Sequence, residues 1–216
     1  LSTGLENNSF REMLHYNPYL ADSAVVSFPR NHIIARTSIS YHPVEVFSAK
    51  AVLLYKLVSN TPLNISTSVG TFLPMYAEVS TMELQGECSW QLSRNDNFTA
   101  YTAYTSAMLT ENTTSTSMLS VPYIPSLKLS GTWNRNWSEQ FGTQITAQNV
   151  SVRYADTDKK QELSGFTTVN LKGEYSFTHS ARVHLRIDNI LNSTVFLWDG
   201  YKERGVFIAA GLTWQF

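Results

Sequence analysis

The sequence predicts an all-β fold, in which about nine long antiparallel strands form a wall with one apolar and one polar face. Three observations favour this fold: alternating apolar and polar residues, long alternating segments, and links of two different lengths. The alternation is clearest over the last thirteen residues, RGVFIAAGLTWQF. Because successive side chains of a strand point to opposite faces, one face of this segment is apolar throughout and ends in two aromatic residues.

The predicted strands are long for a soluble domain. Most have 11–14 residues, whereas globular strands have about 5–6 and a tilted membrane strand needs about 9–11. They cover residues 32–42, 47–58, 79–92, 98–109, 127–137, 141–154, 166–177, 181–191 and 205–216. Residues 49–58 and 9–14 also permit a short helix.

The links between these strands alternate in length. Short links fall at residues 42–46, 93–97, 138–140 and 178–180, and long polar links at 59–78, 110–126, 155–165 and 192–204. Bacterial membrane barrels have short periplasmic turns and longer extracellular loops. The chain is therefore expected to form part of an antiparallel transmembrane β-barrel wall with its short turns in the periplasm.

Composition excludes several other classes of protein. The chain has 43% hydrophobic and 15% charged residues, and its apolar runs are far shorter than the ~18–20 residues of a membrane helix. A net charge of −1 argues against nucleic acid as a partner, because nucleic-acid binding needs a basic surface. Cys88 is the single cysteine, so neither an internal disulfide nor a thiolate metal cluster is expected. The first residues do not form a signal peptide, so we expect either a processed chain or a piece of a longer one.

Aromatic residues flank the short links and share the apolar parity of their strands. Such residues form a girdle where a barrel meets the membrane interface, although aromatic side chains near strand ends also occur in ordinary cores. The predicted girdle consists of Tyr41, Trp90, Trp133, Trp137, Tyr175, Phe177, Trp214 and Phe216.

The opposite parity carries ionisable residues that a closed dry core would not tolerate. In the last strands these are Lys172, Glu174, Arg186 and Asp188, which we expect to form a charge network in a wet or plugged lumen. The predicted register sets Phe177 opposite Val183, so that Glu174 faces Arg186 and Lys172 faces Asp188. A register two residues away would oppose Lys172 to Arg186, a like-charge pair that destabilises a sheet.

Strand number and direction predict a partial barrel. With Phe216 on the periplasmic side, nine antiparallel strands place residues 1–30 outside as an extracellular loop segment, and residues 31–216 form the barrel domain. Single-chain bacterial barrels have an even number of strands, and an open edge in lipid leaves backbone groups unpaired. We therefore expect the C-terminal part of a larger barrel; a tenth strand within residues 1–30, completing a small barrel, is the alternative.

Several motifs resemble the final strands of TonB-dependent outer-membrane receptors. They are VPYIPSLKLSGTW (121–133), LSGFTTVNLKGEYSF (163–177), VHLRIDNILNSTVF (183–196), the terminal Phe216, and SFREMLHYNPYL (9–20) upstream. The resemblance implies a plugged barrel of about 22 strands in the outer membrane of a Gram-negative bacterium, with the plug domain absent from these residues. It also implies as partners the membrane lipid, the remaining strands and plug, the TonB energising complex, and the barrel-assembly machinery, which contacts the C-terminal strand.

The sequence contains no recognisable catalytic or metal-ligating constellation, so we expect neither an enzyme, a cofactor nor a metal site. The five histidines are scattered. The long links instead carry aromatic and charged residues suited to capturing a small ligand, or to packing against other loops or a partner protein. The ligand-contact candidates are Phe196, Trp198, Asp199, Tyr201, Lys202, Arg204, Phe72, Tyr76 and Tyr123.

The predicted function is accordingly that of the C-terminal barrel region of a TonB-dependent receptor. By resemblance it imports a scarce solute of the iron-chelate, cobalamin or glycan type. The alternative is a plugless structural barrel subunit of a multichain outer-membrane complex.

Overall fold

The computed structural model describes residues 2–5, 30–66, 72–110, 119–178 and 180–215, and these residues form β-strands and connecting turns without a helix. In this part of the chain, no helix has the length and apolarity that a membrane span requires. The strands are β1 (Ser2–Leu5), β2 (Arg30–Val44), β3 (Phe47–Ser66), β4 (Phe72–Gln91), β5 (Asp96–Thr110), β6 (Leu119–Ser120), β7 (Leu127–Asn136), β8 (Phe141–Val150), β9 (Arg153–Tyr154), β10 (Glu162–Leu163), β11 (Phe166–Ser176), β12 (Ala181–Asp188), β13 (Phe196–Trp198), β14 (Tyr201–Lys202) and β15 (Phe207–Trp214).

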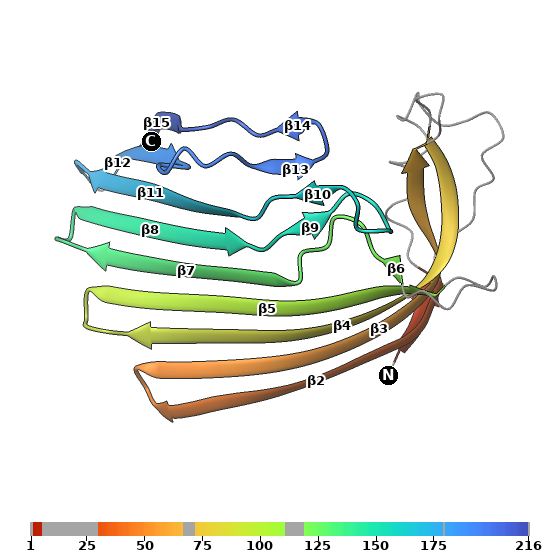
Figure 1. The fold of residues 1–216 in the computed structure, drawn as a ribbon. Helices are drawn as coiled ribbons and strands as arrows, with labels where there is room; N and C mark the ends of the chain where they lie inside the picture. The colour runs from red at the N-terminus through yellow and green to blue at the C-terminus, as the bar shows by residue number, and fades with distance from the viewer. Residues whose placement is uncertain (1, 6–29, 67–71, 111–118, 179, 216) are drawn as a thin grey trace.

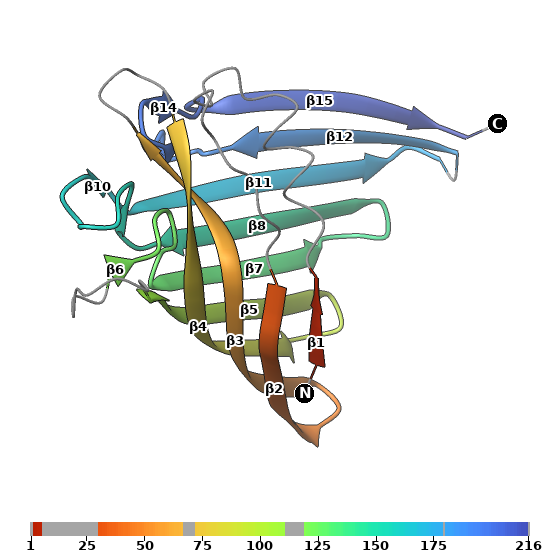
Figure 2. The same ribbon diagram turned by 90° about the vertical axis from the view of Figure 1, so that its right-hand side faces the viewer.

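Eleven of these strands form one antiparallel sheet. Its order is β1-β2-β3-β4-β5-β7-β8-β11-β12-β15, with β6 paired to β5, and each long strand lies beside its neighbour in the chain. Figures 1 and 2 show this sheet as a curved wall, with the hairpins β9–β10 and β13–β14 at one end of it. Among the described residues, β1 and β15 occupy the two ends of the order and do not pair with each other.

All nine predicted long strands are present in the predicted order, as β2, β3, β4, β5, β7, β8, β11, β12 and β15. The helical alternative for residues 49–58 is wrong: this segment belongs to β3, which pairs with both β2 and β4. The alternative at 9–14 lies outside the described residues. The strand β1 pairs with the first part of β2, with Gly4 opposite Asn31.

The link predicted at residues 59–78 is wrong in its described part. There β3 continues to Ser66 and β4 begins at Phe72, with Leu63 opposite Met75. A shift in register between Val58 and Thr61 precedes this extension, and Asn60 in between has a positive φ of 54°. A bulge of this kind lets pairing continue across a position that interrupts the alternation. The polar composition of the segment therefore concealed the paired extensions of β3 and β4.

The register gives the sheet two chemically different faces. On one face, Ile208 lies opposite Ile187 and Leu212 opposite Val183; on the other, His184 lies opposite Gly211. The side chains of Ile208 and Leu212 are 62% and 63% exposed on the apolar face. A small buried cluster of Ala77, Val79 and Leu109, against which Leu119 and Val121 pack, covers part of the polar face near the long links.

The predicted register between β11 and β12 is wrong by two residues. Lys172 lies opposite Arg186, and Glu174 lies opposite His184. The tight turn sets this register, because Phe177 N donates to Ala181 O at 3.0 Å and thereby pairs these two residues.

Carboxylates on the same strands offset the like charges that this register brings together. Lys172 Nζ lies 2.5 Å from Glu174 Oε1, and Arg186 Nη2 lies 3.1 Å from Asp188 Oδ2. Arg182 also approaches Glu174, at 3.7 Å. The four predicted network residues thus share the polar face, but the ion pairs among them run along each strand, and it is Arg182 that pairs with Glu174 across the two strands.

Gly165 provides a test of how the end of β8 approaches the start of β11. A Cβ at this position would lie 2.8 Å from Val150 O and 3.0 Å from Val152 N, both backbone atoms with little freedom to move. We expect Gly165→Ala to lower the free energy of unfolding by about 1–3 kcal/mol, the usual cost of overpacking. Urea unfolding of the whole protein, followed by tryptophan fluorescence, measures this loss.

Gly173→Ala is the matched control, because a Cβ on Gly173 meets no atom within 4 Å. It should change the unfolding free energy by about 0.5 kcal/mol or less. Equal losses in the two variants would contradict the close approach at Gly165.

Candidate functional site

A pocket of about 530 Å³ lies between the polar face of the sheet and the β13–β14 hairpin. We call it the hairpin pocket. Polar-face residues of four adjacent strands form its floor: Lys128, Gln148, Thr168 and Asp188. Tyr123 of the link between β6 and β7, together with Trp198, Glu203 and Arg204 around the hairpin, lines its other sides. Figure 1 shows β13–β14 and β9–β10 at the same end of the wall.

Arg153 is the buried cation of the hairpin pocket. Its side chain has 5% exposure, Nη2 donates to the Phe196 carbonyl, and the guanidinium carbon lies 5.4 Å from the centre of the Phe166 ring. Its Nε is buried with no hydrogen-bond partner among the described residues. Burial lowers the pKa of this guanidinium below its ordinary value, because a charged group loses hydration in the protein. A buried cation with an unpaired donor favours an anion nearby.

The local backbone explains why Arg153 faces the pocket. The regular ladder of β8 ends at Val150, and β9 begins after the interruption at residues 151–152 to pair with β10. An unbroken strand 141–154, as the sequence predicts, would have placed Arg153 on the apolar parity. An arginine on that parity was the one signal in the sequence that the strand ends earlier.

The hairpin pocket is lined by more cationic than anionic side chains. Lys128, Arg153 and Arg204 are cationic, whereas Asp188 and Glu203 are anionic. Asp188 is already paired with Arg186, at 3.1 Å. The guanidinium of Arg204 lies 3.6 Å from the centre of the Phe207 ring, a cation–π contact that orients it. The pocket therefore favours negatively charged groups over positive ones.

Tyr123 presents its ring to the hairpin from a strained backbone. Its φ is 63°, a conformation uncommon for a bulky residue, and its N–H donates to Tyr154 O at 2.7 Å. Its ring lies 4.7 Å from that of Trp198, centre to centre. Burial, with Asp199 and Asp156 nearby, raises the pKa of the Tyr123 phenol. The neutral phenol can donate a hydrogen bond.

Buried amide groups anchor the base of the β13–β14 hairpin. Asn189 is 6% exposed; its Nδ2 donates to Ser193 O at 2.9 Å, and its Oδ1 accepts from Ser193 N at 3.0 Å. Asn170 Oδ1 of β11 in turn accepts from Asn189 N at 2.8 Å. The Asp-Asn-Ile-Leu-Asn segment after β12 thus fixes the hairpin to the wall.

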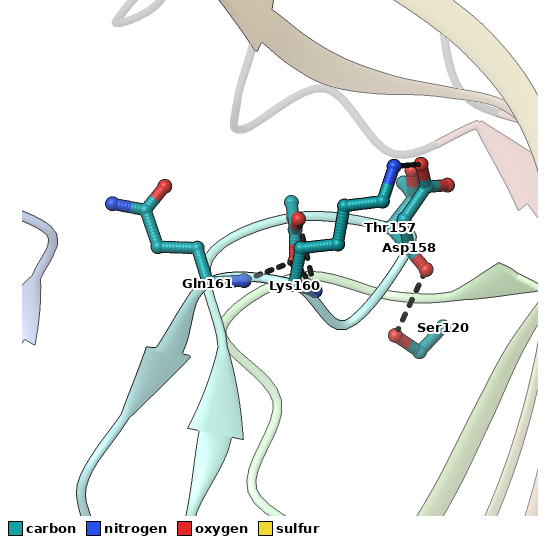
Figure 3. Close-up of polar contacts among 6 residues, drawn as sticks. Ser120, Thr157, Asp158, Lys160 and Gln161 are labelled. Atoms are coloured by element: carbon teal, nitrogen blue, oxygen red, sulfur yellow. Dashed lines mark hydrogen bonds and ion pairs between the residues drawn. The ribbon is translucent and has the colours of Figure 1, made fainter.

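Two contacts join the link between β9 and β10 to the other two long links. Gln161 Nε2 donates to Asp199 Oδ2 at 2.6 Å, which joins the β9–β10 hairpin to the β13–β14 turn. Ser120 N and Oγ both donate to Thr157 O, at 3.2 and 3.3 Å, and Figure 3 shows this contact beside the Lys160–Asp158 ion pair. Exposed contacts of this type contribute little individually. Through these contacts the link between β9 and β10 is joined to both of the other links.

The structure brings together part of the predicted ligand-contact set. Trp198, Arg204 and Tyr123 line the hairpin pocket, Phe196 offers its carbonyl to Arg153, and Asp199 holds Gln161. Tyr201 is 73% exposed, and neither it nor the exposed Lys202 lines the pocket. The backbones of Phe72 and Tyr76 belong to β4, while their side chains lie outside the described residues. Sequence reasoning missed Arg153, Lys128 and Phe166, and the ligand role of every residue stays a prediction.

The described members of the predicted girdle lie on the apolar parity or in the adjoining short turns, near the short-turn ends of their strands. Tyr41, Trp90 and Trp214 are 63%, 49% and 59% exposed. Phe216 lies outside the described residues. Among those that are described, no group of three or more histidine, cysteine, aspartate or glutamate residues is arranged to hold a metal ion.

The family of the chain follows from its sequence and agrees with this fold. The family model "TonB dependent receptor-like, beta-barrel" matches residues 43–190, which is more than half of the chain. The chain therefore belongs to the TonB-dependent receptor β-barrel family, a family of receptors and transporters. No curated protein matches the sequence.

Solved structures of similar fold include three receptors or transporters. The copper transporter OprC has a TM-score of 0.74 at 13% identity, covering 93% of this chain and 34% of its own. A variant of the ferric enterobactin receptor PfeA from Pseudomonas aeruginosa, in complex with enterobactin, has a TM-score of 0.67 at 13% identity, covering 88% and 32%. The ferric-catecholate import receptor Fiu from E. coli has a TM-score of 0.64 at 12% identity, covering 90% and 30%.

At this identity the likeness shows the fold. The chain spans about a third of the length of each of these proteins. It corresponds to a portion of a barrel of this family, as the strand count predicts.

The contact between Arg153 and Phe196 predicts how the β13–β14 hairpin is held. Arg153→Met should speed amide hydrogen exchange over residues 196–202 by about ten-fold, because a hydrogen bond from a charged donor is lost. Hydrogen–deuterium exchange of the whole protein measures this change. Lys128→Met, which alters a floor cation instead, should leave exchange in the hairpin unchanged; equal acceleration in both variants would mean that Arg153 does not hold the hairpin.

Proposed function

We propose that the chain is the C-terminal barrel region of an outer-membrane receptor that imports a scarce solute with energy from TonB. Membership of the family and the receptors of similar fold support this proposal. In the proposed orientation the short turns face the periplasm, the apolar face contacts lipid, and the hairpin pocket opens toward the cell exterior. The plug, the remaining barrel strands, the TonB complex and the assembly machinery are the proposed partners.

The proposed solute is an anionic chelate of the iron-chelate type rather than a cobalamin or a neutral glycan. The observation that carries this choice is the buried Arg153, whose Nε has no partner. Lys128 and Arg204 add positive charge at the same pocket. A neutral glycan would not compensate a buried cation, whereas an anionic oxygen would.

The aromatic residues of the pocket provide a second reason. Trp198 and Tyr123 are in ring contact, and Phe166 lies below the Arg153 guanidinium. Flat apolar groups of a chelate pack well against such rings. Cations beside aromatic rings thus suit a ligand that combines negative charge with planar groups.

Removing the Trp198 ring should weaken capture of the solute. In a strain that takes up ferric catecholate only through the full-length protein, Trp198→Ala should lower uptake at a limiting concentration about ten-fold, because an aromatic contact in a binding pocket is lost. Uptake of radiolabelled iron at a series of chelate concentrations measures the effect.

Tyr201→Ala is the matched control, since Tyr201 belongs to the same hairpin but is 73% exposed and does not line the pocket. It should keep uptake within about two-fold of the unmodified protein. Unchanged uptake in Trp198→Ala, at equal protein level in the membrane, would remove the hairpin pocket from the proposed function.

A further inference from the structure

The apolar face carries an ion pair at its short-turn end. On this parity, the side chains of the described strands that are charged at neutral pH near the short turns are Asp96 at the start of β5 and Arg135 near the end of β7, directly opposite each other. Their neighbours on the same face are Phe98 and Trp133, also a cross-strand pair. A charge on a face that meets lipid is costly unless it lies at the interface and is paired.

Three side chains of the protein contact the carboxylate of Asp96. Ser93 Oγ donates to Oδ2 at 2.7 Å, Trp133 Nε1 donates to Oδ1 at 3.2 Å, and Arg135 Nη1 lies 3.4 Å from Oδ1. The Asp96 side chain is 14% exposed. Its negative charge is therefore compensated by neighbouring side chains of the protein.

Arg135 is arranged differently, because its side chain is partly exposed, although its Nε is buried with no hydrogen-bond partner among the described residues. Its side chain is 40% exposed, and its guanidinium carbon lies 4.3 Å from the centre of the Trp137 ring. Trp137 Nε1 donates to Thr143 Oγ1 at 2.8 Å, which fixes that ring. A guanidinium has several planar N–H donors, and Asp96 takes only one edge of it.

We propose that Arg135 binds the phosphodiester head group of a phospholipid in the leaflet on the short-turn side of the membrane. The terminal Nη groups of the guanidinium can donate hydrogen bonds to phosphate oxygens, and stacking on Trp137 orients them before the lipid arrives. Leu129 and Phe141, exposed by 41% and 39% on the same face, offer apolar surface to the acyl chains.

The level of Arg135 in the sheet supports a lipid as the occupant. Trp133, Trp137 and Tyr175 lie at the same end of the strands, where aromatic rings meet lipid head groups in membrane barrels. Inorganic phosphate would gain nothing from the apolar surface beside the arginine. This proposal requires the apolar face to lie in a membrane, but it does not depend on the solute or on import.

Native mass spectrometry of the full-length protein tests the proposal. The protein is released from detergent micelles that contain a series of phosphatidylglycerol concentrations, and the fraction with bound lipid is measured. For Arg135→Gln, the concentration that gives equal occupancy should rise about five-fold, the effect of one basic residue near an anionic head group. Asp96→Asn should bind at least as tightly as the unmodified protein, since the carboxylate is not a lipid ligand.

Arg94→Gln is the matched control. Arg94 is an exposed cation in the short turn directly before β5, but it does not contact Asp96, Arg135 or Trp137 in the contacts described above. It should bind lipid like the unmodified protein. An equal loss in Arg94→Gln and Arg135→Gln would overturn the proposal in favour of diffuse attraction, and so would no loss in Arg135→Gln. Should Arg135→Gln fail to assemble, Trp137→Leu, which removes the ring beneath the guanidinium, must lower occupancy, and unchanged occupancy in that variant overturns the proposal.

Solute uptake separates this proposal from the proposed function. Arg135→Gln should import the chelate normally, because Arg135 is on the face opposite the hairpin pocket. Loss of lipid binding with normal uptake supports the head-group site. Normal lipid binding by Arg135→Gln together with lost uptake contradicts the head-group site. That result does not bear on the proposed role of the hairpin pocket.

Discussion

The hydrogen-bonded ladder between neighbouring strands holds the wall together and fixes both of its faces. A wall in a membrane must pair its backbone N–H and C=O groups within the protein, because lipid offers them no partner. The register from β2 through β15 does this over long antiparallel pairs, and bulges adjust the ladder where the chain departs from strict alternation. Since pairing fixes the parity of each residue, the ladder also decides which side chains share a face.

On the polar face, the parity of the strands brings polar and charged side chains to one pocket. Lys128, Thr168 and Asp188 reach the same pocket because the register aligns β7, β8, β11 and β12 at one level. The pocket takes its remaining walls from segments where the ladder ends and the chain turns back over the sheet. Arg153 depends on such an ending, since its position follows from the interruption after Val150. The apolar face is simpler, and the ion pair of Asp96 and Arg135, near its short turns, stands out for that reason.

The long strands and their faces could be predicted, because apolar and polar residues alternate over many positions, and each alternation strengthens the evidence for a strand. The register between β11 and β12 could not, because the charges of Lys172 and Glu174 suggested one pairing, whereas the turn at Phe177 imposed another. The pairing of β3 with β4 beyond Val58 was hidden by the polar composition of that segment. Trp198, Arg204 and Tyr123 were predicted as ligand contacts from their residue types, and they do line one pocket. Arg153 was missed, because the interruption of the strand after Val150, which decides where its side chain points, was not predicted.

Spin labels along β15 report whether one face of the wall meets lipid and the other meets water. Cys88 is the single cysteine, so a Cys88→Ser background allows labels at Ile208→Cys, Ala209→Cys, Leu212→Cys and Thr213→Cys in the full-length protein. Labels at 208 and 212 should collide mainly with oxygen, which dissolves in lipid, and labels at 209 and 213 with a water-soluble nickel reagent. Equal accessibility of all four positions to the nickel reagent, or the reverse pattern, would contradict the account.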